Sequence, residues 1–358
     1  MKICFFADSE SIHTARWCEH FHSLGHEVHL ISFKTLILPN IQNHTVNLEK
    51  INVAGGNWKV LLKFRTVRNI VKDISPDIFH SLYATSYGIT GSLVGFHPYI
   101  ITALGSDILL SPKQSKIYRF LLKFAFSKTD LITVMSDQMK METEKLGVSS
   151  AKIITLPFGI DPKMFNAKNR KLDKNKFVIT STRNFEEVYN IPHLIKAVAK
   201  AKEKIPSIHL NLIGTGTEER TLKELVKQLH LEECVTFFGK VPQSKIAEVL
   251  NQSHVFVSVS LSDGNNISLN EAMACDTLCI ATNIPANTQW IQHNQNGFLV
   301  EIDAVDALVD YLVLAAEKYD EFQQSALPIN RRLLEEKGIW ANNMKRMEDI
   351  YEELILKK

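Results

Sequence analysis

Two acidic side chains, Asp263 and Glu271, stand eight residues apart on either side of a polar loop. An apolar, β-branched run of strand length, 255–260, precedes the loop, and a helical pattern begins at Ser268. A loop that joins a strand to a helix presents backbone N–H groups and the positive end of the helix dipole, which favour a bound anion. Carboxylates accept hydrogen bonds from hydroxyl groups. The stretch therefore predicts a site where backbone amides hold a phosphate and the two acids accept sugar hydroxyls.

The same residues have a purely structural interpretation. Ser268-Leu-Asn-Glu271 matches the capping box, in which the serine and the glutamate satisfy the first amides of their own helix. The local pattern leaves both interpretations open, and the rest of the chain has to decide between them.

Length and composition indicate a globular protein of two domains. The chain has 358 residues, 45% of them hydrophobic and 22% charged, which excludes disordered and collagen-like classes. A formal net charge of +2 does not predict nucleic-acid binding. The apolar runs are too short for a membrane span, and the first residues lack the pattern of a signal peptide. Five scattered cysteines favour a reducing compartment, so we expect a cytoplasmic protein.

Strand and helix patterns alternate twice along the chain, which predicts two consecutive parallel α/β domains. A polar, lysine-rich segment at 167–176 is the best linker between the two series. We expect a first domain over 1–165, a second over 166–335, and a last helix within 336–358 that packs back toward the first domain. The expected strands are 2–7, 28–33, 77–80, 99–103, 131–134 and 152–156 in the first domain, and 177–182, 209–213, 235–238, 255–260, 278–281 and 298–300 in the second.

Ligands of such sheets bind at the carboxyl ends of the strands, where the loops 8–14, 104–107, 183–190, 214–217 and 262–268 are expected. Arg183 follows a strand directly and could fork onto a diphosphate, or form a surface ion pair with Glu186 or Glu187. The turn with Gly214 and Gly216 is either a phosphate site or a plain strand–helix turn.

Polar groups also follow strands in the first half of the chain. His13 could orient a sugar hydroxyl or the departing phosphate, and Asp107 could contact an acceptor hydroxyl. Two segments of this half, 58–68 and 113–128, pair cations with aromatic residues at helical spacing. Such helices either lie on an anionic membrane or are ordinary surface helices with one buried face.

Over nearly its whole length the chain resembles the retaining nucleotide-sugar glycosyltransferases of the GT-B fold, the group called family four. The strongest match is Asp263-Gly-Asn-Asn-Ile-Ser-Leu-Asn-Glu271, which is similar to the pair of acids that the family separates by seven residues. The segments 156–165, 214–216, 238–239 and 296–299 resemble other landmarks of the family in order and spacing.

The resemblance implies two Rossmann-like domains, with a donor site in the second and an acceptor site in the first. It implies an enzyme that needs no metal or cofactor and moves a sugar, most often from UDP, to a saccharide or lipid-linked saccharide in polysaccharide synthesis. Its catalytic residues would be His13, Asp107, Arg183, Asp263 and Glu271. Its donor-binding residues would be Ser9, Glu10, Gly214, Gly216, Asn265, Asn266, Ile267, Ser268 and Glu271.

The sequence departs from the family pattern at several positions. Val188 stands where a lysine usually follows the arginine, Leu104 replaces a histidine, Asp276 replaces a glycine, and Gln289 replaces an acid. Two other functions therefore stay open, a nucleotide-sugar 2-epimerase and a catalytically weak nucleotide-sugar-binding protein. We also expect no nucleic-acid partner, and peripheral contact with the cytoplasmic membrane face remains open.

Overall fold

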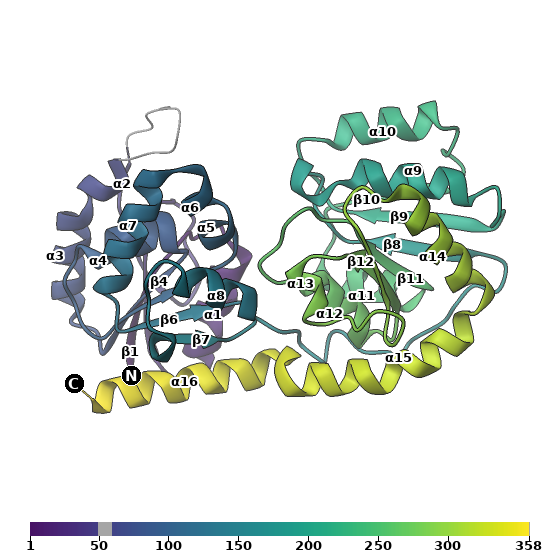
Figure 1. Cartoon of the computed structure of the whole chain (residues 1–358). Coiled ribbons are helices and arrows are strands. Elements are labelled where there is room, and N and C mark those ends of the chain that lie inside the picture. The colour runs from purple at the N-terminus through teal and green to yellow at the C-terminus, as the bar shows by residue number, and fades with distance from the viewer. Residues whose placement is uncertain (49–58, 358) are drawn as a thin grey trace. The chain divides into compact units, whose positions relative to one another are not determined.

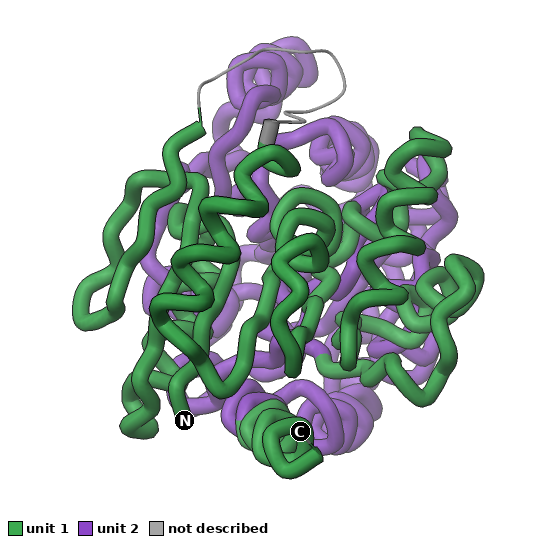
Figure 2. The backbone as a smooth tube through the Cα atoms, turned by 90° about the vertical axis from the view of Figure 1, so that its left-hand side faces the viewer, with its two compact units in different colours: residues 1–156, 345–358 green, residues 157–344 purple. Residues whose placement is uncertain are grey.

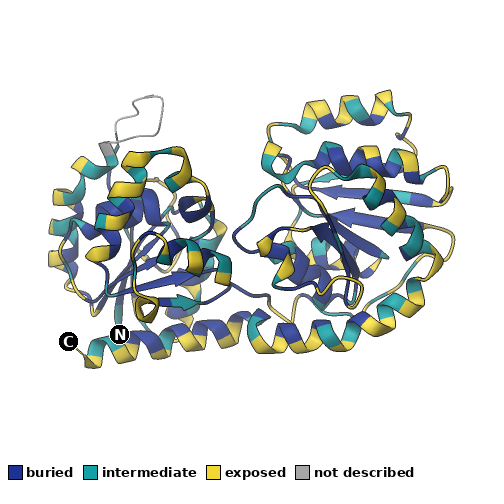
Figure 3. Cartoon of the chain, in the orientation of Figure 1, coloured by how far each residue is buried: buried dark blue, intermediate teal, exposed yellow. Residues whose placement is uncertain are grey.

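The computed structural model describes residues 1–48 and 59–357. The chain divides into two compact units, residues 1–156 with 345–358 (unit 1) and residues 157–344 (unit 2), and this division falls within the last helix, α16 (Trp340–Leu356) (Figure 2). The inner strands of each sheet are buried, and helices expose their outer faces in both units (Figure 3).

Unit 1 contains a seven-stranded parallel sheet in the order β3-β2-β1-β4-β5-β6-β7 (Figure 1). Its strands are β1 (Lys2–Phe6), β2 (Glu27–Ser32), β3 (Gln42–Thr45), β4 (Ile78–Leu82), β5 (Tyr99–Thr102), β6 (Leu131–Val134) and β7 (Ile153–Thr155). Its helices are α1 (Ile12–Ser23), α2 (Lys59–Leu62), α3 (Phe64–Ile74), η1 (Ala84–Gly88), α4 (Ile89–Ser92), α5 (Ser106–Leu109), α6 (Ser111–Gln114), α7 (Lys116–Ser127), α8 (Asp137–Glu144) and η2 (Ser150–Lys152).

Successive aromatic residues of β1 pack on opposite faces of this sheet, as the two-residue period of a strand requires. Phe5 contacts Trp17 and Phe21 of α1, whereas Phe6 contacts Phe79 of β4 and Tyr87 of η1. Both faces of the sheet are therefore apolar, which is typical of a parallel sheet covered by helices on either side.

The C-terminal part of α16 completes one face of unit 1. Tyr351 packs against Phe21, and its hydroxyl group lies 2.6 Å from Nδ1 of the buried His80. Nε2 of His80 lies 2.7 Å from the hydroxyl group of Thr102. Glu348 forms a further contact with His26 at 2.8 Å. The last helix is thus part of the core of unit 1.

Unit 2 contains a six-stranded parallel sheet in the order β10-β9-β8-β11-β12-β13. Its strands are β8 (Phe177–Ser181), β9 (Ile208–Ile213), β10 (Val235–Gly239), β11 (Val255–Ser258), β12 (Leu278–Thr282) and β13 (Phe298–Val300). Its helices are η3 (Glu187–Tyr189), α9 (Ile191–Ala201), α10 (Glu219–Gln228), α11 (Gln243–Asn251), α12 (Ile267–Ala274), α13 (Pro285–Thr288), α14 (Val305–Glu317), α15 (Tyr319–Leu333) and η4 (Leu334–Gly338).

Helices cover both faces of this sheet (Figure 1). One core cluster joins the strands to α9, α10 and α14, and a second joins them to α11, α12 and the end of α15. The expectation of two parallel α/β domains is confirmed.

Residues 157–165, which we expected in the first domain, belong to unit 2. Ile160 donates its amide to Gly338 O at 2.7 Å and accepts from Trp340 N at 2.9 Å. A side chain on Gly159, which has a φ of +76°, would lie 2.7 Å from Gly338 O. Only glycine adopts this φ without strain and tolerates so close an approach. Phe165 is part of the core of unit 2, which explains why the whole segment belongs there.

The predicted strands are all present, with ends shifted by one or two residues. Edge strand β3 was missed because its sequence, Gln42-Asn-His-Thr45, has no apolar pattern. The segment 58–68, which has helical spacing, falls on two helices, α2 and α3, and Trp58 lies outside the described residues. Helix α8 is capped by Ser136, whose Oγ accepts from Met139 N.

Acidification is predicted to destabilise the protein through His80. Burial lowers the pKa of His80 to about 3, whereas an unfolded histidine has a pKa near 6.5. The unfolded chain therefore binds a proton that the folded chain does not bind as the pH falls below about 6.5. This lowers the free energy of unfolding by up to about 1.4 kcal/mol per pH unit. Urea unfolding between pH 7 and pH 5 measures how the free energy of unfolding changes with pH. In the His80→Gln variant this slope should be smaller than in the wild type, by up to the equivalent of one bound proton. The exposed His22→Gln control should retain the wild-type dependence, and equal slopes for both variants would contradict the assignment.

Candidate functional site

The loop that joins β11 to α12 is capped by Asn266, not by Ser268. Helix α12 begins at Ile267, and Asn266 Oδ1 accepts from the amide of Leu269 at 3.2 Å. Glu271 is then the fifth residue of the helix, too far along to reach back to the cap. The capping-box interpretation is wrong for this structure. Within the described part of the chain, the amide of Ser268 has no hydrogen-bond acceptor, as is usual for the second residue of a helix.

A buried polar network fixes this end of α12. The amide nitrogen of Asn266 donates to Ser258 Oγ at 3.0 Å and to Asn287 Oδ1 at 2.9 Å. Asn287 in turn donates to the carbonyl group of Thr282 at 2.9 Å. Asn266 and Asn287 are both fully buried. Because a buried amide without partners is costly, these bonds hold the loop in one conformation.

Arg183 lies directly beside the start of α12. Its guanidinium donates to Asp263 Oδ2 at 2.6 Å and to Asn266 Oδ1 at 3.0 Å. The side chain is only 9% exposed. The structure therefore places the arginine and the strand–helix loop together, and the alternative, a surface ion pair with Glu186 or Glu187, is not formed.

The aromatic ring of Tyr189 covers the guanidinium, with Arg183 Cζ 4.2 Å from the ring centroid. A stacked guanidinium keeps its edge free for hydrogen bonds while its face is shielded from water. Tyr189 follows Val188, which stands where the family pattern has a lysine, and the carbonyl group of Val188 accepts from Leu261 N at 2.8 Å. At this position the chain thus has a ring that orients the arginine instead of a second cation.

Gly214 and Gly216 pack against the backbone that follows β8. Gly214 has a φ of +151°, and a Cβ atom on it would lie 2.5 Å from Arg183 O. A Cβ atom on Gly216 would collide with the carbonyl oxygen of Phe185. Phe185 also donates to Thr215 O at 3.0 Å. These glycines therefore let two loops of the protein meet, and the close approach that they allow is made by the chain itself.

The other predicted site residues of unit 2 differ in their exposure and in their hydrogen-bond partners. Glu271 is 9% exposed and is the fifth residue of α12. Asn265 is buried, and its Oδ1 accepts from Trp290 Nε1 at 3.0 Å and from Gln289 Nε2 at 3.3 Å. Ile267 is the first residue of α12. The side chain of Asn265 is thus engaged in holding α13 and the turn after it.

In unit 1, Ser9, Glu10 and His13 lie in the loop after β1 and at the start of α1. Ser9 is buried and its amide donates to Ser32 Oγ at 3.1 Å. Glu10 is exposed and pairs with Lys34 at 2.9 Å. His13 is the second residue of α1 and is half-buried. These three residues belong to unit 1 and Arg183 belongs to unit 2, and their proximity stays a prediction.

Asp107 does not face solvent. Its carboxylate is 0% exposed and accepts from the amides of Gly105 at 2.8 Å and Ala84 at 2.7 Å. Burial raises the pKa of Asp107, while the amide hydrogen bonds, including one from Leu104, favour the charged form. This arrangement corrects the expectation of a contact with an acceptor hydroxyl, since both carboxylate oxygens already hold the loop after β5 to η1.

One departure from the family pattern has a local explanation. Asp276 follows α12 and has a φ of +54°, a conformation that favours glycine and that aspartate tolerates better than most residues. Its carboxylate also accepts from Arg331 at 3.2 Å.

Sequence reasoning missed Tyr189, Asn287 and Trp290 as residues that shape the site. Asn287 and Trp290 act through partners 21 and 25 residues away, and their surrounding residues carry no motif. Tyr189 is close in sequence to Arg183, but the spacing alone does not show that its ring covers the guanidinium. A buried tryptophan usually needs an acceptor for its N–H group, which is the signal that could have linked Trp290 to a polar loop.

No group of three or more His, Cys, Asp or Glu side chains that could hold a metal ion occurs within residues 1–48 and 59–357. In the same residues, no helix is long and apolar enough to cross a membrane. All five cysteines are free and buried.

Two parallel α/β units, the second with a buried arginine beside a helix start, define a Rossmann-like protein of the GT-B class. The solved structure of Anabaena Alr3699/HepE in complex with UDP shares this fold, with a TM-score of 0.81, 15% identity, and coverage of 99% of this chain and 100% of that chain. The family model "Glycosyl transferase 4-like" matches residues 2–136, and "Glycosyl transferases group 1" matches residues 163–326. The chain belongs to the group 1 glycosyltransferases, the family-four GT-B enzymes.

Two relatives extend this assignment. N-acetyl-alpha-D-glucosaminyl L-malate synthase of Bacillus anthracis is 28% identical over 306 residues, which cover 81% of this chain and 79% of the relative. UDP-Gal:alpha-D-GlcNAc-diphosphoundecaprenol alpha-1,3-galactosyltransferase of Escherichia coli is 25% identical over 263 residues, which cover 68% of this chain and 67% of the relative. The chain is thus a glycosyltransferase of glycan synthesis.

The contact between the two loops predicts that Gly216→Ala is destabilising. The added methyl group would collide with the carbonyl group of Phe185, and overpacking of this kind typically costs about 1–3 kcal/mol. Thr215→Ala is the matched control, because Thr215 is exposed in the same turn and surface changes usually stay within about 0.5 kcal/mol. The urea midpoints of both variants measure the difference. A Gly216→Ala variant as stable as the control would show that the loops are not in tight contact.

Proposed function

We propose that the chain transfers a sugar from a nucleoside diphosphate, most readily UDP, to a saccharide or lipid-linked saccharide, with retention of the anomeric configuration. The observation that carries this proposal is the position of Arg183 against the start of α12, 3.0 Å from Asn266. A guanidinium and the free amide of a helix start together form a strong anion site, as a diphosphate requires.

The ion pair between Arg183 and Asp263 suggests how the donor would be held. A diphosphate brings more negative charge to the guanidinium than one carboxylate does, so it would displace Asp263 from Arg183. The released carboxylate would then accept a hydroxyl group of the donor sugar, while Glu271 would accept the ribose hydroxyls. The amide of Ser268 would stabilise the same diphosphate in the transition state, when the leaving group gains charge.

The names of related proteins support the choice of donor and acceptor. The Anabaena structure holds UDP, and the Escherichia coli relative is named for UDP-Gal and a diphosphoundecaprenol acceptor. The Bacillus anthracis relative is named for L-malate, so the saccharide acceptor in the proposal rests on the Escherichia coli relative.

The proposed reaction needs neither a metal ion nor a protein nucleophile. Arg183 and the amides of α12 would stabilise the leaving diphosphate, and the leaving phosphate would take the proton of the attacking acceptor hydroxyl on the same face of the sugar. His13 would orient the sugar hydroxyls or the departing phosphate at this stage. Transfer in the presence of EDTA, with the α-linkage of an α-linked donor kept in the product, is the expected outcome.

A panel of nucleotide sugars with a set of saccharide acceptors tests the donor site. We expect the wild type to release nucleoside diphosphate. In Arg183→Ala the rate of this release should fall about 100- to 1,000-fold, because one charged hydrogen-bond donor to the leaving group is lost. Glu271→Ala should raise the KM for the donor. Lys227→Gln, which changes an exposed residue of α10 outside the donor loops, serves as the control that leaves the rate unchanged.

Three outcomes would contradict parts of this proposal. If both Arg183→Ala and Glu271→Ala released nucleoside diphosphate at the wild-type rate, the assignment of the donor site would be refuted. Formation of a sugar epimer without any acceptor would indicate a 2-epimerase instead. Calorimetric binding of UDP without turnover on any donor and acceptor would indicate a binding protein.

Peripheral contact with an anionic membrane is a second part of the proposal, supported by the exposed surface of α2 and α7. Both helices pack against α4 (Figure 1). Leu62 is 73% exposed on α2, and Ile117 and Phe120 are 60% and 70% exposed on α7. The exposed cations Lys116, Arg119 and Lys123 lie on the same helix, α7. Exposed apolar side chains among cations are typical of helices that lie on anionic lipid.

Co-sedimentation with phosphatidylcholine vesicles, with and without phosphatidylglycerol, tests this contact. We expect binding only to the anionic vesicles, reduced several-fold in Phe120→Ser because the ring would insert at the lipid interface. Ile302→Ser, which removes an exposed apolar side chain from unit 2, is the control. Equal binding to both vesicle types, or equal loss in the control, would show that α7 is an ordinary surface helix.

A further inference from the structure

One face of the sheet in unit 2 is polar at its edge. Along β9 the sequence Ile208-His-Leu-Asn-Leu-Ile213 alternates, so that His209 and Asn211 point away from the core formed by Leu210 and Leu212. Residues Thr236 and Phe238 of β10 lie on the same face as His209 and Asn211. Parallel sheets usually carry apolar side chains on both faces, so this edge is built to contact something other than a helix.

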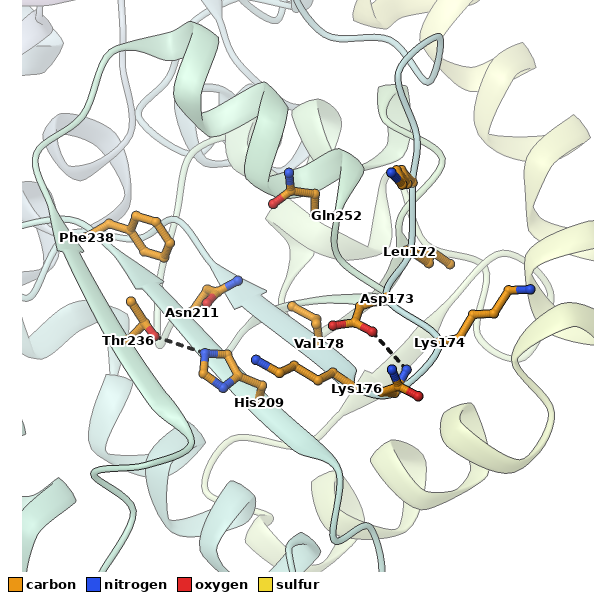
Figure 4. A pocket seen from close by; sticks show the side chains of 12 residues that line it. Leu172, Asp173, Lys174, Lys176, Val178, His209, Asn211, Thr236, Phe238 and Gln252 are labelled. Atoms are coloured by element: carbon orange, nitrogen blue, oxygen red, sulfur yellow. Dashed lines mark hydrogen bonds between the residues drawn. The ribbon is translucent and has the colours of Figure 1, made fainter.

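A cavity of about 800 Å³ lies over this face (Figure 4). The segment 171–176, which precedes β8, and Gln252 at the end of α11 form its other walls. Its volume is in the usual range for small-molecule sites. None of the residues that line it belongs to the loops 183–190, 214–217 or 262–268 of the donor site.

The charges around this cavity are mainly positive. Lys171, Lys174 and Lys176 are exposed, and none has an ion-pair partner among the residues that the structure describes. The single acid, Asp173, accepts a hydrogen bond from the amide of Asn175 at 2.9 Å. In Figure 4 the ammonium group of Lys176 extends across the sheet toward His209. Burial, assisted by Lys176, lowers the pKa of His209, so the lysines are the main cations at neutral pH.

Neutral polar groups and one aromatic ring complete the lining. Asn211 is buried, yet its amide nitrogen makes only one long hydrogen bond, 3.4 Å, to Thr180 Oγ1. His209 Nε2 lies 2.9 Å from Thr236 Oγ1. Phe238 presents a flat apolar surface at one end of the cavity (Figure 4). Amides and hydroxyls bind sugar hydroxyls, and an aromatic ring packs against the apolar face of a sugar ring.

We propose that this cavity binds an acidic oligosaccharide, with the lysines of 171–176 on its carboxylates, the amides of Asn211 and Gln252 on its hydroxyls, and Phe238 under one sugar ring. Lysine suits this task because its ammonium group is a mobile point charge that can follow irregularly spaced carboxylates. The site is separate from the donor loops and does not depend on the transfer reaction. It would hold a charged glycan on unit 2 whether or not Arg183 is intact.

Calorimetric titration of the full chain with tetragalacturonic acid, at low and moderate salt, tests the proposal. We expect binding that weakens as salt rises, and maltotetraose, the neutral tetrasaccharide, should bind at least about tenfold more weakly. Lys176→Gln should weaken tetragalacturonic acid binding about threefold, and replacement of all three lysines by glutamine about tenfold or more. Phe238→Ala should weaken both tetrasaccharides.

Two controls separate this site from the donor site and from general charge effects. Lys227→Gln removes an exposed lysine of α10, on the opposite face of the sheet, and should leave the affinity unchanged. Arg183→Ala should bind tetragalacturonic acid as well as the wild type does. The proposal is overturned if tetragalacturonic acid does not bind, if maltotetraose binds equally well, or if Lys176→Gln and Lys227→Gln behave alike. Equal binding of a thymidine tetranucleotide would assign the cavity to anions in general.

Discussion

The buried pair of Arg183 and Asp263 is the interaction on which the arrangement of unit 2 depends. A guanidinium so little exposed requires a charged partner, because removal of one member of a buried ion pair costs about 3–5 kcal/mol. Asp263 provides that charge across 2.6 Å, and Asn266 supplies a second acceptor. Any anion that binds here must replace the carboxylate with at least equal charge, which selects for phosphates over neutral ligands.

The scaffold around this pair is rigid because each loop is held by another loop. Glycines 214 and 216 bring the turn after β9 into contact with the backbone of 183–185, and Asn266 and Asn287 link the starts of α12 and α13. Tyr189 then closes the face of the guanidinium. Polar groups are thus buried in unit 2 mainly where they fix the position of a charge, whereas the rest of its core is apolar.

The surfaces outside the donor loops follow a different rule. On α7 and at the edge of β9 and β10, aromatic rings lie among lysines that form no ion pair with any residue that the structure describes. Contact with the two acidic partners that we propose, a lipid surface in one case and a glycan in the other, would explain the composition of these surfaces.

The sequence by itself determined the two parallel α/β units, nearly every strand, and the loops that carry the site, because these depend on local periodicity and on strand order. It also singled out Arg183, Asp263 and Glu271. Only the tertiary structure decided that Asn266 caps α12, that Asp107 is enclosed by amides, and that Tyr189 covers Arg183. Those outcomes depend on loop conformations that are held by contacts distant in sequence, namely Asn266 with Asn287, Asp107 with Ala84, and Val188 with Leu261. The packing of the sheet, and not the spacing in sequence, sets these contacts.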